Sequence, residues 1–92
     1  ALADNAQYWL GEAHYVNRQF TEALRHFRTV VEKYPDSRKI PDALLKIGYC
    51  NYELKNFTEA RSALGQLVSR FDDTTAARLA NQRLSKMEAE GR

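Results

Sequence analysis

Apolar side chains recur every three or four residues along most of the chain, which is the spacing of one face of an α-helix. In the first run they fall at Ala6, Leu10, Ala13 and Val16, and a second run covers residues 23–34. Later runs repeat this pattern. The spacing predicts five helices, near residues 2–17, 21–34, 38–54, 58–71 and 75–90.

The pattern is itself repeated at an offset of 37 residues. The stretch "FTEA" stands at residues 20–23 and again at 57–60, and Gly11 is matched by Gly48. A partial third copy follows at the same offset, in residues 75–92. Such a period is typical of a solenoid, in which each unit buries its apolar face only against its neighbours. We therefore predict an all-α solenoid of antiparallel helix pairs.

A chain of 92 residues has the size of one small domain. Small residues lie where the two helices of a pair are expected to cross, Gly11 with Ala23 and Gly48 with Ala60. They allow the helices to approach closely, with bulky side chains filling the space beside them. The predicted units are a first repeat, a second repeat and a capping helix, at residues 1–37, 38–74 and 75–92.

The junction between the two repeats contains both prolines of the chain. Pro35 stops the second helix, because the residue before a proline is disfavoured in the α region. Ser37 is expected to cap the third helix, leaving Pro41 in its first turn, where a missing amide donor costs little. Thr74 offers the same capping chemistry at the later junction. The extra residues of this repeat are expected to lengthen a helix by about one turn.

Charge and composition exclude several classes of function. The 14 basic and 12 acidic residues are interspersed, with a formal net charge of +2, so no nucleic-acid partner is expected. No apolar run approaches the roughly 20 residues of a membrane span, so no direct membrane insertion is expected. The sequence carries no glycine-rich phosphate loop and no cluster of catalytic groups. We expect no enzyme activity and no cofactor.

Neither the cysteine nor the histidines predict a metal site. Cys50 is the only cysteine, which excludes an internal disulfide and a cysteine-based metal framework. It takes the position of Ala13 in the repeat, so an inert core thiol is expected. His14 and His26 lie on different predicted helices, without a second pair of ligands at suitable spacing.

Two sets of residues resemble the signature of the tetratricopeptide repeat (TPR) family, and together they span almost the whole chain. The first set is Leu10-Gly11, Ala13, Phe20, Ala23, Phe27 and Tyr34-Pro35, and the second is Ile47-Gly48, Phe57, Ala60, Leu64 and Phe71. The period of 37 exceeds the family's usual period of about 34. Asp72 stands where the family has its closing proline.

Residues 5–49, with the junction "YPDSRKIPDALLKIG", resemble more narrowly the C-terminal TPR domain of the Tol-Pal system family called YbgF or CpoB. This resemblance implies a periplasmic protein whose TPR domain binds TolA. It also implies a role in coordinating outer-membrane constriction with septal peptidoglycan synthesis during cell division. Two alternatives stay open: a structural scaffold that self-associates into oligomers, and an outer-membrane protein assembly factor.

The first helix of each pair lines the concave face of a TPR solenoid, which makes that face the expected site for a protein partner. Tyrosine suits such a site because it combines a large apolar area with a hydroxyl group. Four tyrosines are expected to grip an extended or helical peptide, although some could instead fill the groove between adjacent helices. The expected contact residues are Asn5, Tyr8, Glu12, Tyr15, Leu45, Tyr49, Tyr52, Glu53, Gln82 and Arg83.

Trp9 has Lys46 and Arg83 as its counterparts in the later repeats, which predicts a position at least partly exposed to water. An exposed tryptophan on a small domain usually has a partner that covers it. We expect Trp9 to pack against an upstream repeat or against a second copy of the chain.

Overall fold

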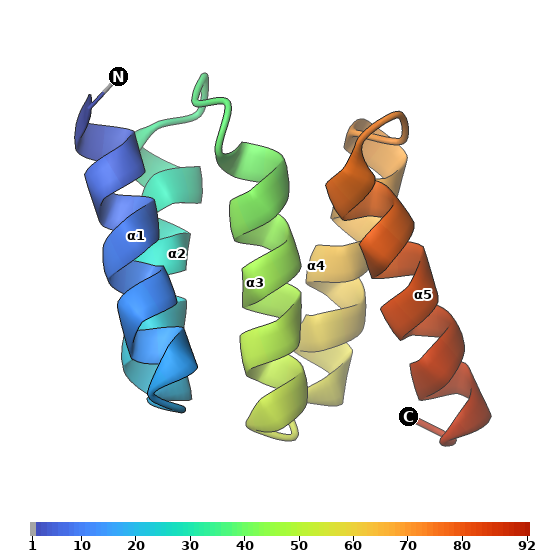
Figure 1. Cartoon of the computed structure of the whole chain (residues 1–92). Helices are drawn as coiled ribbons and strands as arrows, with labels where there is room; N and C mark the ends of the chain where they lie inside the picture. The colour runs from blue at the N-terminus through green and yellow to red at the C-terminus, as the bar shows by residue number, and fades with distance from the viewer. Residues whose placement is uncertain (1) are drawn as a thin grey trace.

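The computed structural model describes residues 2–92, which form five α-helices joined by short connections (Figure 1). The helices are α1 (Leu2–Val16), α2 (Phe20–Lys33), α3 (Ile40–Glu53), α4 (Phe57–Arg70) and α5 (Thr75–Ala89). No strand occurs among the described residues. The all-α prediction is therefore confirmed, and each helix begins and ends within two residues of its predicted bounds.

The helices form two layers. Figure 1 shows α1, α3 and α5 side by side in front, with α2 and α4 behind them. Each helix packs against the next one along the chain, and α3 also contacts α5. This zigzag order is that of a helical solenoid. We call the surface that α1, α3 and α5 present on the side away from α2 and α4 the first-helix face.

The two helix pairs close with the same three-residue turn. Arg18 in the first turn has φ of 59°, and Lys55, its counterpart in the second turn, has φ of 65°. The next amide donates to the carbonyl oxygen five residues earlier, at 2.9 Å in the first turn and 2.8 Å in the second. A left-handed residue followed by an amide that donates to a carbonyl oxygen of the last helical turn is a standard way to end a helix.

Within each pair, a glycine of the first helix faces a bulky side chain of the second. A Cβ atom at Gly11 would lie 2.6 Å from Cε1 of Phe27, and one at Gly48 would lie 2.4 Å from Cδ2 of Leu64. The two alanines predicted at these crossings are completely buried. The predicted close approach of the helices is therefore confirmed in both pairs.

The junction between α2 and α3 differs from the prediction. Helix α3 begins at Ile40, and it has 14 residues, as α2 and α4 do. The extra residues therefore do not lengthen a helix; they form turns over residues 35–39. Ser37 does not cap α3, because its hydroxyl accepts from the amide of Lys39 at 3.0 Å and donates to the carboxylate of Asp4 in α1. Pro41 lies in the first turn of α3, as predicted.

The physical reason for this difference is that the junction is tied to α1. Asp4 is buried and receives the Ser37 hydroxyl, and the ammonium of Lys39 lies 4.8 Å from the ring centroid of Tyr8. At the junction between α4 and α5, Thr74 does cap the helix, because its Oγ1 accepts from the amide of Ala77 at 3.1 Å.

Candidate protein-binding face

The expected partner-binding residues lie on the three helices of the first-helix face, but they differ in exposure. Tyr8 and Leu45 are only 6% and 5% exposed, so they offer a partner little surface. The half-buried members are Asn5, Glu12, Tyr15, Tyr49, Tyr52 and Arg83, and the exposed members are Glu53 and Gln82.

Two of the half-buried tyrosines are flanked by a cation from the next helix of the layer. The ammonium of Lys46 in α3 lies 4.5 Å from the ring centroid of Tyr15 in α1. The guanidinium carbon of Arg83 in α5 lies 4.8 Å from the ring centroid of Tyr52 in α3. The two cations are 37 residues apart, and so are the two tyrosines. The same contact is therefore made at the same place in successive repeats. The tyrosines therefore partly fill the grooves between first helices, as the alternative interpretation expected.

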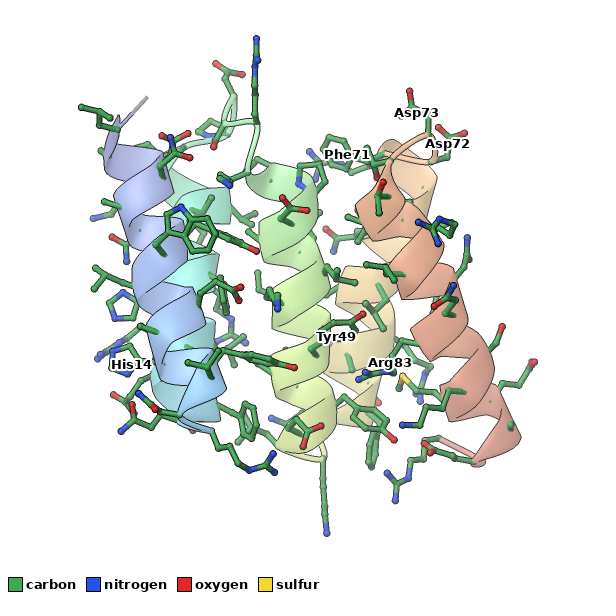
Figure 2. The ribbon with its side chains drawn as sticks, in the orientation of Figure 1. His14, Tyr49, Phe71, Asp72, Asp73 and Arg83 are labelled. Carbon is green, nitrogen blue, oxygen red and sulfur yellow. The ribbon has the colours of Figure 1, made fainter. Side chains whose placement is uncertain are left out.

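Arg83 makes a second, closer ring contact. Its guanidinium carbon lies 4.2 Å from the ring centroid of Tyr49, and Figure 2 shows Arg83 reaching from α5 toward that ring on α3. One nitrogen of the guanidinium, Nη1, is buried and has no hydrogen-bond acceptor among the described residues. A buried donor without an acceptor is costly. The contacts with Tyr49 and Tyr52 hold the guanidinium against the two rings, and the side chain as a whole is half-buried.

Two acidic residues of the face are paired with cations. The carboxylate of Glu12 lies 3.1 Å from the ammonium of Lys46, with both side chains about one-fifth exposed. Glu53 lies 3.6 Å from the guanidinium of Arg18 in the first turn. Toward α5, the cations beside the tyrosines are Arg83, Lys86 and Arg92, and each lies over the ring of Tyr52. The face therefore presents aromatic rings and, toward α5, several cations.

Two phenols of the face have raised pKa values. Burial raises the pKa of Tyr15 and of Tyr8, so both phenols keep their protons at neutral pH. The hydroxyl of Tyr52 donates to the carboxylate of Glu90 at 2.6 Å. Tyr8 and Tyr15 therefore act as hydrogen-bond donors rather than as bases, and the hydroxyl of Tyr52 is already bonded within the chain.

Trp9 is 57% exposed, as its position in the repeat predicted. Its ring meets the ring of Tyr8 edge-on at a centroid distance of 5.2 Å. The ammonium of Lys39 lies 5.0 Å from its centroid. The residue therefore marks the outer end of the same row of rings and cations.

Sequence reasoning missed that cations flank the rings. Lys46 and Lys39 were not among the expected contact residues, although both lie over rings of α1. The signal was present, because Lys46 follows Tyr15 by 31 residues and Arg83 follows Tyr52 by the same number. In a repeat of 37 residues, this spacing puts Lys46 six residues before Tyr52 and Arg83 six residues before Ala89, which takes the tyrosine's position in the third copy.

Two hollows lie away from the tyrosines. One of about 220 Å³ is bordered by α2, α3 and α4 and includes Val31, Ile47 and Ala63. Another of about 600 Å³ lies along α4 and α5 and includes Arg61 and Leu84. Neither hollow is lined by the tyrosines. These two hollows therefore lie apart from the row of tyrosines on the first-helix face.

The histidines and the cysteine offer no reactive site. The rings of His14 and His26 stack at 5.2 Å, and a glutamine side chain hydrogen-bonds to each ring. No group of three or more potential metal ligands occurs within residues 2–92. Cys50 is fully buried, and burial raises the pKa of its thiol to about 12. The thiol therefore stays protonated, as expected for a core position.

Comparison with known proteins agrees with this architecture. A family model described as tetratricopeptide repeat matches residues 1–38 and 10–73, which together make up well over half of the chain. A search of curated proteins finds no match. In the part of the chain that the structure describes, none of the helices has the length and apolar character needed to cross a membrane.

Proposed function

The chain belongs to the tetratricopeptide repeat family, and from this premise we propose that its first-helix face binds a segment of a protein partner. Repeats of this family generally serve as non-catalytic protein-interaction modules. The observation that supports this face is the row of half-buried tyrosines, Tyr15, Tyr49 and Tyr52, with cations beside them. Tyrosine and arginine are the residues most enriched where binding energy is concentrated.

The chemistry of the face favours a partner segment with acidic and apolar side chains. The guanidinium of the half-buried Arg83 lies over the rings of Tyr49 and Tyr52, and the ammonium of Lys86, an exposed residue, lies 5.4 Å from the ring centroid of Tyr52. A carboxylate from the partner would pair with Arg83, while a neighbouring apolar side chain would cover the exposed side of Tyr49 or Tyr52. Charge-assisted pairing of this kind adds specificity to the apolar contact.

The partner that we propose is TolA, and the proposed setting is the periplasm. There the protein would act in the Tol-Pal system, coordinating outer-membrane constriction with septal peptidoglycan synthesis. This part of the proposal is supported by the resemblance of residues 5–49 to the C-terminal TPR domain of the YbgF or CpoB family.

A calorimetric titration of purified TolA into the chain tests both the proposed binding face and the proposed partner. Tyr52→Ala and Arg83→Gln should each weaken binding at least ~10-fold, which corresponds to about 1.4 kcal/mol. Arg25→Gln is the matched control, because Arg25 lies on α2 with its side chain 71% exposed, and it should leave the affinity unchanged. Thermal unfolding of each variant shows whether the fold is intact.

The outcomes separate the binding face from the partner. If TolA binds the wild type and all three variants equally, the first-helix face is not the site. If TolA does not bind the wild type at all, the assignment to the Tol-Pal system fails.

A further inference from the structure

The two grooves between neighbouring first helices are built alike but differ in charge. We call them the α1–α3 groove and the α3–α5 groove. In each, a cation of the later helix lies over a tyrosine of the earlier helix. A third position differs, because Glu12 in the α1–α3 groove is replaced by Tyr49 at the equivalent place in the α3–α5 groove, 37 residues later. One groove therefore holds a carboxylate where the other holds a neutral ring.

In the α1–α3 groove, the cation is already paired with an anion. The ammonium of Lys46 lies 3.1 Å from the carboxylate of Glu12, and both side chains are about one-fifth exposed. The same ammonium lies 4.5 Å from the ring centroid of Tyr15. A second carboxylate entering this groove would meet the charge of Glu12 at close range, which opposes its binding. This groove therefore favours uncharged side chains, which can cover the half-buried ring of Tyr15.

In the α3–α5 groove, the equivalent cation lies against rings and has no paired anion. The guanidinium carbon of Arg83 lies 4.2 Å and 4.8 Å from the ring centroids of Tyr49 and Tyr52, and Arg83 forms no salt bridge within residues 2–92. The carboxylate of Glu90 accepts the hydroxyl of Tyr52 and lies 3.9 Å from the guanidinium of Arg92. A guanidinium without a paired carboxylate can hold one from a partner through two parallel hydrogen bonds.

We propose that this difference fixes the direction in which a partner segment crosses the first-helix face. An acidic side chain of the segment lies against Arg83 in the α3–α5 groove, and uncharged apolar side chains lie against Tyr15 in the α1–α3 groove. The proposal rests on the proposed function, because it specifies how that face distinguishes the two ends of a protein segment. Glu12 and Tyr49 are then specificity-determining residues. With the same charge in both grooves, the segment would bind in either direction.

The direction can be measured with a blocked peptide that spans both grooves. It carries two glutamates at one end, two leucines at the other, and a nitroxide spin label beside the leucines, which broadens the NMR signals of nearby protein groups. We expect the strongest broadening on α1, including the indole N–H of Trp9, and little on α5. A second peptide with the label beside the glutamates should give the opposite distribution.

Two substitutions test which residues set the direction. Glu12→Gln removes the carboxylate from the α1–α3 groove, so the peptide should bind several-fold more tightly and broaden signals of α1 and α5 to similar extents. Adding Tyr49→Glu gives Arg83 the partner that Lys46 has in the original chain, so this double variant should reverse the direction. Arg25→Gln, on α2, is the matched control and should leave the direction unchanged. If the double variant does not fold, Glu12→Gln alone decides.

The outcomes separate this proposal from the function on which it rests. A peptide that binds the first-helix face equally in both directions, or that keeps its direction in the variants, contradicts the fixed direction and leaves the binding face in place. A peptide that broadens no signal on α1, α3 or α5 at millimolar concentration contradicts the binding face itself, and the direction with it.

Discussion

The α1–α2 and α3–α4 pairs make nearly the same contacts between their own two helices, but the outer faces of their first helices differ in burial. Each has a glycine against a bulky side chain, and each closes with a left-handed residue at the same place in its turn. Yet Cys50 in α3 is fully buried, whereas its counterpart Ala13 in α1 is exposed. The comparison teaches that the contacts within a pair are set by its own sequence, while burial of its outer face depends on the neighbour that covers it.

Removing the equivalent apolar side chain from each pair should give the largest difference. Ile47→Ala should cost about 2–5 kcal/mol of unfolding free energy, because this side chain of α3 is buried in a helix on which α2 packs. Leu10→Ala should cost less than about 1 kcal/mol, because Leu10 is half exposed. Urea unfolding followed by circular dichroism measures both. Equal losses would contradict the difference between the two outer faces.

Adding a methyl group at the helix crossings should affect the second pair strongly. Gly48→Ala should destabilise the chain by about 1–3 kcal/mol, because the new Cβ meets Leu64. Gly65 in α4 is the matched control, since a Cβ there meets nothing within 4 Å. Gly65→Ala should stabilise by about 0.5–1 kcal/mol through helix propensity. The same unfolding experiment should show changes in stability of opposite sign for the two variants. Changes of the same sign would refute the close approach of α3 and α4 at Gly48.

Replacing the left-handed turn residues by glycine should change the stability less, and by different amounts in the two pairs. Lys55→Gly should stabilise the chain by up to about 1 kcal/mol, because glycine adopts positive φ without the cost that other residues bear. Arg18→Gly should gain less, because Arg18 also pairs with Glu53 and stacks on the ring of Phe20. Thermal unfolding of both variants tests this order. A larger gain at Arg18 would show that these side-chain contacts contribute nothing.

The last expected effect is a pH dependence that arises from Asp4 in the first repeat. The hydrogen bond from Ser37 lowers the pKa of Asp4 from 3.8 to about 2. The stability that this carboxylate contributes is therefore fully present above about pH 4 and is lost as the pH falls toward 2. Asp4→Asn should flatten this part of the profile of stability against pH. Urea titrations between pH 2 and 5 measure it.

The helices and their pairing could be predicted because the information is local or repeats at a fixed offset. The apolar spacing predicts the helices, and the match of Gly11 with Gly48 predicts where the two helices of each pair cross. The junction could not be predicted in this way. Its turns depend on Ser37 bonding to Asp4, 33 residues away and with no equivalent one repeat later, where Thr74 caps its own helix instead.

The candidate face was predicted only in outline. The register placed tyrosines along α1 and α3, but it did not show that Tyr8 is buried or that Lys46 lies over Tyr15. Those details depend on contacts between first helices of different repeats. Apolar periodicity within one helix carries no information about such contacts.

The central claim is that a partner binds the first-helix face, and mapping amide chemical shifts by NMR during a titration with TolA tests it most directly. The account predicts the largest changes at Tyr15, Tyr49, Tyr52 and Arg83, with small changes on α2 and α4. Largest changes around Val31 and Ala63, which line the hollow on the other layer, would contradict it.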